Sequence, residues 1–261
     1  MGKGVRAIAV SSLVFVSLPT LIVLVSSFSS GRLLKFPPPG ISIQPYLNML
    51  GSALIRRALA RSLEVGALSV AFSLLLGVGA AIALFRHRVR LRSLMTGYLM
   101  LGFTTPLVVS GMAFLVLFIR VGMFGKLWPM ALAITIVNLP LLIFAVASSI
   151  AALNPELEEA AATLGAEQVQ TFLFVTLPGL MPGILTGSIM MFVFGMTEFL
   201  VSLILSTISN QTLPVVMFGS LRGAVSPILA AAGGLYIVIA FAVVFVISRL
   251  RSLEDFLRRP D

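Results

Sequence analysis

The chain has 261 residues, of which 59% are hydrophobic and 10% are charged, and its mean hydropathy is +1.11. An ordinary soluble domain is about one quarter charged, and a soluble chain this short would expose much of its surface to water. The composition therefore excludes a soluble domain and indicates a membrane protein. Lys and Arg number 18 against 9 Asp and Glu, and they sit at the ends of apolar runs. That placement is typical of membrane orientation rather than of a nucleic-acid-binding face.

The chain offers few of the side chains that enzymes use. It has no cysteine, which removes disulfides, thiolate catalysis and zinc–thiolate sites. Its single histidine, His87, lies among arginines and cannot form a metal site alone. Gly125-Lys126 lacks the earlier glycine and the following Ser or Thr of a phosphate-binding loop. We therefore expect no catalytic residues, no metal site and no cofactor in this chain.

Charged residues divide the chain into apolar runs that are long enough for helices to cross a bilayer, which takes about 20 residues each. The run 7–31 is longer than the core of a cleaved signal peptide and predicts a retained span. Prolines in 36–55 predict a loop, and the basic segment 55–61 predicts a short surface helix. We expect an all-α membrane protein that forms a single domain with six transmembrane helices. The expected spans are 8–28, 63–85, 94–118, 129–151, 184–205 and 229–249.

Prolines and glycines refine these expected spans. Leu177-Pro178 and Pro182 predict that the fifth helix begins only near Ile184. Pro106 and Pro140 fall inside spans three and four, where neighbouring helices can satisfy a kink, and a hinge is the less favoured alternative. Close helix packing is predicted at Gly77, Gly79 and Gly195.

The basic residues also predict how the chain is oriented in the membrane. An even number of spans places both termini on one side. Basic residues cluster in the short loop 86–92, which includes Arg88, and in the tail, which includes Arg258 and Arg259. Short segments rich in Lys and Arg stay in the cytoplasm, so we expect cytoplasmic N- and C-termini and periplasmic loops at 29–62 and 206–228.

The predicted cytoplasmic loop 152–183 is polar and acidic, unlike the rest of the chain. Asn154 and Pro155 predict the start of a short helix, and Gly165 predicts its end. Three acidic residues favour the positive end of that helix: Glu156, Glu158 and Glu159. A second short helix is expected before Leu177-Pro178. An ordinary solvated helix–turn–helix would account for these features by themselves.

The spacing within this loop resembles a known family. Glu159-Ala160-Ala161 is followed by three residues, Gly165, nine residues and then Val175-Thr176-Leu177-Pro178. This resembles the EAA loop of binding-protein-dependent ABC importer permeases, whose pattern is EAA, three residues, G, nine residues and I-x-L-P. Only the isoleucine is changed, to Val175, and the loop follows the fourth of six expected spans. The resemblance covers nearly the whole chain.

The resemblance implies the fold of a type I ABC importer permease and a role for the loop 152–183. In the family this loop is a coupling helix that docks in a cleft of a cytoplasmic ATPase. The residues implied at the docking surface are Glu159, Ala160, Ala161 and Gly165. Leu177 and Pro178 would set the angle from the coupling helix into the fifth span. The basic residue that the family usually carries after the EAA is replaced here by Ala162 and Thr163.

The resemblance also implies partners and a location. We expect a homologous permease subunit, two cytoplasmic ATPase subunits, a periplasmic solute-binding protein and surrounding lipid, but no nucleic acid. ATP and Mg²⁺ would be bound by the ATPase partner. The implied location is the bacterial inner membrane, and the implied mechanism is alternating access.

Glu198 is the one acidic residue deep inside an expected span. An ionisable side chain is costly in lipid, so it marks either a substrate pathway or a polar contact with a partner subunit, and both alternatives stay open. A carboxylate that faces the pathway would favour a cationic solute and disfavour an anion.

Other segments resemble the spermidine/putrescine-type branch of the family. They are 212–215, Leu221-Arg222, Ser226-Pro227, Ala230-Ala231 and, before Tyr46, 36–40. The implied substrate is a polyamine or a similar small cationic solute. The alternatives are a permease of the same class for another small solute, such as an aminophosphonate or an amino acid derivative, and an ion-coupled secondary transporter. Secondary transporters often carry several intramembrane charges and broken helices.

Overall fold

A computed structural model describes residues 3–31, 33–87, 89–221 and 226–257 of the protein. Over these ranges the chain consists of helices and loops, with one isolated bridge that pairs Ser29 with Ile41. The all-α fold class predicted from the sequence is confirmed. The basic residues Arg88, Arg222, Arg258 and Arg259, on which predictions of orientation or branch partly rest, lie outside the described residues.

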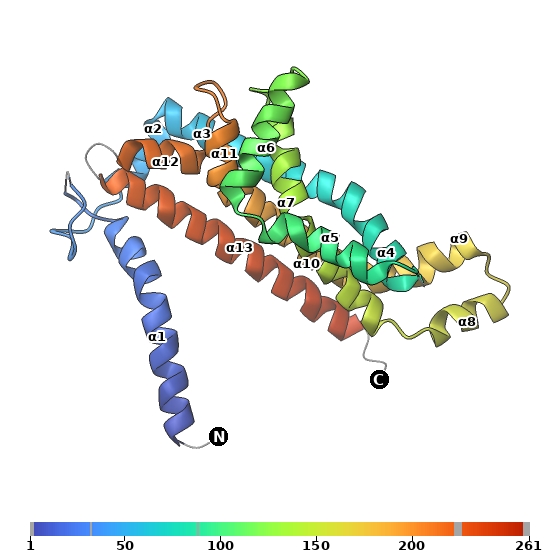
Figure 1. Ribbon diagram of the computed structural model, residues 1–261. Helices are drawn as coiled ribbons and strands as arrows, with labels where there is room; N and C mark the ends of the chain where they lie inside the picture. The colour runs from blue at the N-terminus through green and yellow to red at the C-terminus, as the bar shows by residue number, and fades with distance from the viewer. Residues whose placement is uncertain (1–2, 32, 88, 222–225, 258–261) are drawn as a thin grey trace. The chain divides into compact units, whose positions relative to one another are not determined.

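Figure 1 shows the helices in chain order. The first half of the described chain contains α1 (Lys3–Ser26), α2 (Gln44–Gly51), α3 (Ala53–Ser73), the π-helical turn η1 (Leu74–Val78), α4 (Gly79–Arg86), α5 (Arg92–Thr104) and α6 (Leu107–Arg120). The second half contains α7 (Leu127–Ala152), α8 (Glu156–Thr163), α9 (Gln168–Thr171), the π-helical turn η2 (Phe172–Thr176), α10 (Leu177–Thr197), α11 (Leu200–Leu205), α12 (Leu213–Leu221) and α13 (Pro227–Leu257).

Several of these helices are long enough and apolar enough to cross a membrane. Within the described ranges they are Gly4–Ser26, Ala53–Arg86, Leu127–Ala152 and Gln168–Thr197. A further crossing would consist of α5 and α6 together, which are bent by 95° relative to each other. The last helix, α13, runs from Pro227 to Leu257. The count of six spans and the cytoplasmic position of the termini stay predictions.

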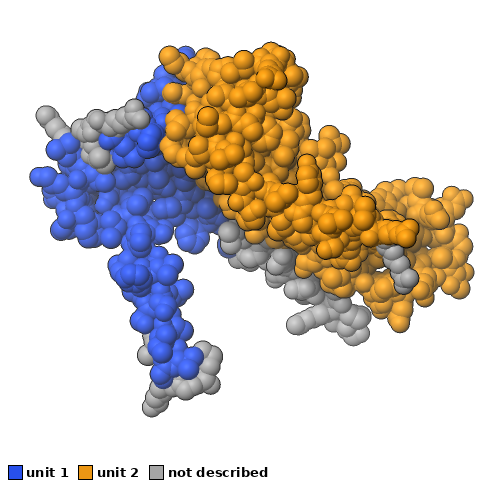
Figure 2. Space-filling model, viewed as in Figure 1, with its two compact units in different colours: residues 1–58, 215–245 blue, residues 59–214, 246–261 orange. Residues whose placement is uncertain are grey.

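The chain divides into two compact units, which Figure 2 colours separately. Unit 1 comprises residues 1–58 and 215–245, and unit 2 comprises residues 59–214 and 246–261. Inside unit 1, the hydroxyls of Ser27 and Tyr46 are hydrogen-bonded at 2.8 Å, which joins the end of α1 to α2. Gly234 of α13 packs against the same two residues, because a Cβ at this position would lie 3.3 Å from Ser27 Cβ. Unit 1 is therefore held by polar as well as apolar contacts.

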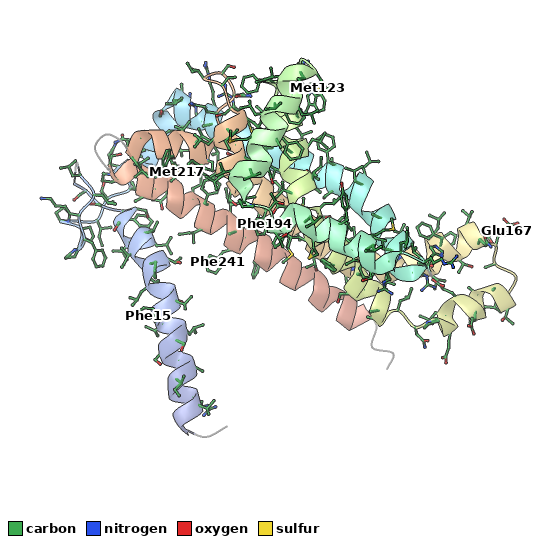
Figure 3. All side chains as sticks on the ribbon, viewed as in Figure 1. Phe15, Met123, Glu167, Phe194, Met217 and Phe241 are labelled. Atoms are coloured by element: carbon green, nitrogen blue, oxygen red, sulfur yellow. The ribbon has the colours of Figure 1, made fainter. Side chains whose placement is uncertain are left out.

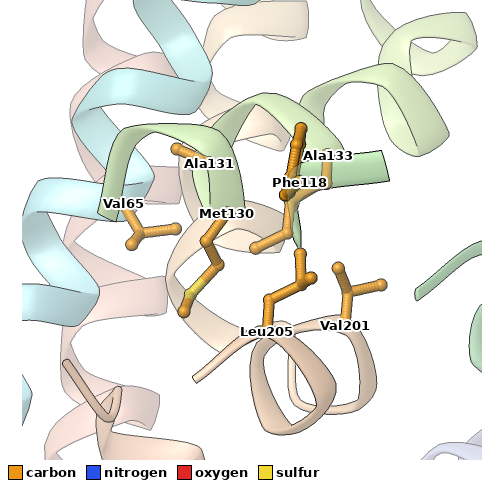
Figure 4. Close-up of a cluster of buried hydrophobic side chains, with 8 residues drawn as sticks. Val65, Phe118, Met130, Ala131, Ala133, Val201 and Leu205 are labelled. Carbon is orange, nitrogen blue, oxygen red and sulfur yellow. The ribbon is translucent and has the colours of Figure 1, made fainter. Parts of the chain in front are cut away.

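Unit 2 contains two clusters of buried apolar side chains, and α7 contributes to both. The cluster in Figure 4 joins α3, α6, α7 and α11 and consists of Val65, Phe118, Met130, Ala131, Ala133, Ile134, Val201 and Leu205. The second cluster joins α4, α7 and α10 and consists of Ala81, Leu142, Ile143, Val146, Ile150, Leu180, Ile184 and Met191. With 13 residues of α7 buried, this helix is the central element of unit 2.

Helix α10 approaches α7 closely along a row of glycines spaced four residues apart. Gly179, Gly183 and Gly187 occupy one face of α10, as helical periodicity requires. A Cβ at Gly183 would lie 2.9 Å from Val146 Cα, and a Cβ at Gly187 would lie 2.9 Å from Leu142 Cα. Small residues in this spacing allow two helix backbones to meet inside a membrane. This four-residue spacing of glycines is visible in the sequence itself.

The three glycines that were predicted to allow close packing have different outcomes. A Cβ at Gly77 would collide with Leu142, and one at Gly195 would lie 2.8 Å from Ser69 Cβ, so both positions require a small residue. The prediction for Gly79 is wrong, since a Cβ there would meet no atom within 4 Å. Composition alone cannot distinguish these positions, because the contact depends on which helix lies opposite.

The two prolines inside expected spans also differ. Pro140 remains inside the continuous helix α7. At Pro106 the helix is instead broken, and the helices on either side, α5 and α6, are bent by 95° relative to each other. Proline disfavours helical backbone at the preceding residue, and Thr105 is accordingly extended with φ −68° and ψ 136°. The expectation of a tolerated kink at Pro106 is therefore wrong.

Two expected helix boundaries require correction. The fifth expected span, placed at 184–205, begins earlier, because an unbroken helical segment runs over Gln168–Thr197 and a short helix α11 follows. Pro178 lies in the first turn of α10, directly after the π-helical turn η2, whose wider hydrogen-bonding pattern accommodates a residue without an N–H. The basic segment 55–61 is not a separate surface helix, since it is part of the 34-residue helix Ala53–Arg86.

A single methyl group tests the contact between α7 and α10. Gly187→Ala should lower the midpoint of thermal unfolding, because overpacking against the backbone of α7 costs about 1–3 kcal/mol. The matched control is Gly79→Ala, which should be neutral or stabilising because alanine favours helix and no atom lies in the way. Unfolding would be followed by thermal denaturation of the purified chain in detergent micelles. Equal midpoints for the two variants would contradict the contact.

Candidate functional site

Helix α8 begins where the chain leaves α7. The Oδ1 atom of Asn154 accepts a hydrogen bond from the Glu156 N–H at 3.1 Å, which satisfies one of the free amides at the start of the helix. Glu156, Glu158 and Glu159 all lie in the first turn, where the helix dipole stabilises negative charge. The short helix is thus encoded locally, by its cap and its charges.

Helix α8 ends in a Schellman motif, and Gly165 makes this possible. The Ala166 N–H donates to the Ala161 carbonyl at 3.0 Å, and the Gly165 N–H donates to the Ala162 carbonyl at 3.0 Å. Gly165 has φ +86°, a left-handed conformation that residues with a side chain rarely adopt. A Cβ here would meet no atom within 4 Å, so the need for glycine comes from the backbone and not from packing.

The predicted docking residues lie on or near the surface of α8. Glu159, Ala160 and Gly165 are exposed, and Ala161 is half-buried. Leu164, between them and Gly165, is 89% exposed, which is unusual for leucine in a polar loop. The structure therefore brings the EAA residues and an exposed leucine together on one short helix.

Glu158 of α8 is half-buried, and its side chain connects this helix to α4 and to η2. Its carboxylate forms an ion pair with the Arg86 guanidinium at the end of α4, and it accepts a hydrogen bond of 2.5 Å from the Thr176 hydroxyl in η2. The side chains of Arg86 and Glu158 are 22% and 19% exposed. We name Arg86, Glu158 and Thr176 the junction triad. It fastens the short helix to two helices of unit 2.

The sequence alone does not reveal the junction triad. Its patterns relate Glu158 only to the helix dipole and Arg86 only to membrane orientation. No spacing in the sequence joins these residues, because they come from three separate elements. A pocket of about 330 Å³ lies beside them, lined by Ala162, Ala166, Gln168 and Phe172 among others. Ala162, which lies where the family usually has a basic residue, lines this pocket together with the three triad residues.

Leu177 and Pro178 lie where the π-helical turn η2 changes into α10. The Leu177 N–H donates to the Phe172 carbonyl, five residues earlier, and Pro178 has no N–H to donate. The π-helical turn therefore accommodates a following residue that has no backbone N–H to donate. The segment from α9 to α10 is continuous, and the prediction that these two residues set its direction stays a prediction.

Glu198 lies at the break between α10 and α11, half-buried. Its Oε1 accepts a hydrogen bond from the Leu200 N–H at 3.0 Å, and its Oε2 accepts one from the Ser202 N–H at 3.1 Å. The carboxylate therefore satisfies free amides at the start of α11, a local use that the sequence analysis did not consider. Since α10 rises about 1.5 Å per residue, Glu198 lies roughly 30 Å along the helix from Leu177. The two candidate sites occupy opposite ends of α10.

The sequence of residues 73–254 matches the model of one protein family, the binding-protein-dependent transport system inner membrane component. The match covers more than half of the chain. The chain belongs to this family. It is the permease component of an ABC importer and a non-catalytic subunit, as the EAA pattern predicts.

Relatives of this permease carry different solutes. It is 26% identical to the spermidine/putrescine transport system permease protein PotC of Escherichia coli K12, over 88% of this chain and 87% of PotC. It is 30% identical to the sulfate transport system permease protein CysW of Synechococcus elongatus, over 76% of this chain and 77% of CysW. Polyamines and sulfate have opposite charges, so membership of the family does not select the solute.

The fold is shared with solved ABC importers. The permease resembles a chain of a bacterial alginate ABC transporter in complex with its alginate pentasaccharide-bound periplasmic protein, with a TM-score of 0.68 at 16% identity, over 94% of this chain and 91% of that chain. The likeness confirms the predicted type I importer permease fold. Permeases of this kind work with ATPase subunits and a periplasmic binding protein.

The junction triad can be tested with a double-mutant cycle. Glu158→Gln and Arg86→Gln should each lower the unfolding midpoint by roughly 2–4 °C, because a partly buried ion pair contributes about 1 kcal/mol. The double variant should be no less stable than either single variant, since the same interaction is lost once. Midpoints would be measured by thermal denaturation of the purified chain. Additive losses would show that Arg86 and Glu158 do not interact.

Proposed function

We propose that this permease imports a polyamine or a similar small cationic solute. It would form the pathway with a second, homologous permease chain, above two ATPase subunits and below a periplasmic binding protein. The observation that carries the proposal is Glu198, a carboxylate at a break between two apolar helices of unit 2. An acid inside an apolar span is costly and is by default functional.

Glu198 retains the capacity to attract a cation while it caps α11. The carboxylate carries a negative charge and accepts backbone hydrogen bonds on both oxygens, from the Leu200 N–H and the Ser202 N–H. The two backbone bonds also fix the orientation of the carboxylate, which reduces the entropy lost when a cation binds. The similarity to PotC supports the same class of solute, whereas the similarity to CysW favours an anion.

We propose that α8 transmits the ATPase cycle to the membrane helices. The exposed face with Glu159, Ala160 and Leu164 is available to an ATPase cleft. The junction triad on the other side would pass a displacement of α8 to α4 and, through η2, to α10. On this proposal the loop 152–183 and both termini lie in the cytoplasm, and the loops 29–62 and 206–228 face the periplasm.

The solute class can be tested on the assembled transporter. In lipid vesicles with the binding protein, ATP hydrolysis should be stimulated by spermidine or putrescine and not by sugars, amino acids or oxyanions. Glu198→Gln should reduce polyamine transport at least tenfold, because it removes the negative charge and keeps an acceptor oxygen. The matched control is Glu64→Gln, an exposed acid on α3. Stimulation by sulfate or a sugar would retain the importer and overturn the cationic solute.

The coupling role of α8 can be tested at Gly165. Gly165→Val should uncouple ATP hydrolysis from transport or release the ATPase, since a left-handed conformation costs a branched residue about 1–2 kcal/mol or more. Gly165→Asn should retain most coupling, because asparagine tolerates this conformation. Co-purification of the ATPase and transport per ATP would both be measured. Normal assembly and transport in the valine variant would refute the assignment.

A further inference from the structure

An apolar groove of about 530 Å³ lies between α4 and α5 in unit 2. Its base on α4 is formed by Ala80, Ala83 and Leu84, and its wall on α5 includes Leu94 and Tyr98. Leu94 and Tyr98 are 69% and 76% exposed, so the groove is open to its surroundings. The two alanines leave room where larger side chains would fill the space between the helices.

Two arginines lie next in sequence to Val89 and Leu91, which line one end of this groove. The turn between α4 and α5 carries Arg90 and Arg92, and both are exposed. No described carboxylate forms an ion pair with either, whereas Arg86 is already paired with Glu158. The Arg92 guanidinium stacks over the Phe85 ring at 4.6 Å from its centroid, which holds this charge at the end of α4.

The charges and the groove follow each other along α4 and α5. Ala83 lies three residues before Arg86, and Tyr98 lies six residues after Arg92, so the groove begins within one or two turns of the arginines and extends about 10 Å from them. A matching ligand has an anion at its head and an extended hydrocarbon chain below. A zwitterionic lipid matches less well, because its own cationic group would lie among the arginines.

We propose that the groove between α4 and α5 binds an anionic phospholipid. One acyl chain lies over Ala80 and Ala83, and the phosphate is held by Arg90 and Arg92. Clusters of basic residues at the cytoplasmic ends of membrane helices favour such lipids. Arg86 lies about one helix turn from Ala83 and joins α4 to α8 through its ion pair with Glu158. A bound lipid would therefore also stabilise the end of α4 that contacts α8. The site does not depend on which solute is carried.

The test uses lipids with brominated acyl chains, which quench tryptophan fluorescence on contact. The chain has one tryptophan, Trp128, so Trp128→Phe removes the native tryptophan fluorescence. Tyr98→Trp in this background then places a single fluorescent reporter in the groove. The matched reporter is Phe15→Trp on α1, since Phe15 is 75% exposed on an apolar helix (Figure 3). The full-length chain would be reconstituted in phosphatidylcholine vesicles that contain brominated phosphatidylglycerol or brominated phosphatidylcholine.

Brominated phosphatidylglycerol should quench the groove reporter at much lower mole fraction than brominated phosphatidylcholine, while the Phe15→Trp reporter responds equally to both. Arg90→Gln with Arg92→Gln should weaken the preference about 25-fold, because each basic residue near an anionic lipid contributes roughly a factor of five. Arg57→Gln with Arg120→Gln, which removes two exposed arginines outside the groove, should leave the preference unchanged.

A second variant separates the site from a general effect of charge. Ala83→Phe fills the base of the groove and leaves both arginines in place, so it should abolish selective quenching. Equal quenching by the two brominated lipids at the groove reporter would overturn the proposal and show ordinary surrounding lipid. Selective quenching in the isolated chain that disappears in the assembled transporter would also overturn it, because a partner subunit would then cover the groove.

Discussion

The close contact between α7 and α10 is the constraint on which the rest of unit 2 depends. Lipid tails are as apolar as leucine, so exclusion from water does not drive two membrane helices together, and close packing of their surfaces must do so. Gly183 and Gly187 allow the α10 backbone to reach the α7 backbone near Leu142 and Val146. Because α7 also contributes to both buried clusters, this contact positions α3, α4, α6 and α11 around a common helix.

A second constraint is that backbone amides and carbonyls in lipid must find partners within the protein. At the break after α5, Thr105 satisfies the Leu101 carbonyl twice, through its N–H at 2.9 Å and its hydroxyl at 2.6 Å. At the break after α10, the carboxylate of Glu198 satisfies two amides of α11. The halves that follow these breaks, α6 and α11, pack together where Gly111 meets Ile204. At both breaks, side chains therefore compensate for the irregular backbone.

The loop between α7 and α10 has two faces with different chemistry. One face of α8 is exposed and carries Glu159, Ala160 and Leu164. The other is fastened by Glu158 to α4 and to η2. A short helix with one free face and one fixed face is suited to transmit a displacement, since a partner on the free side acts on the membrane helices through a few directed bonds. The same junction lies next to the arginine turn of the α4–α5 groove.

Local features of the sequence determined the helical class, the positions of most apolar helices and the loop that places this chain among importer permeases. They did so because hydropathy, helix caps at Asn154 and Gly165, and the EAA spacing act over a few neighbouring residues. Only the tertiary structure decided that Gly77 and Gly195 are packed while Gly79 is open, that Pro106 breaks a helix while Pro140 does not, and that Glu158 pairs with Arg86. Each of these depends on the element that lies opposite, and an all-round apolar helix carries no pattern in its sequence that says which face meets which partner.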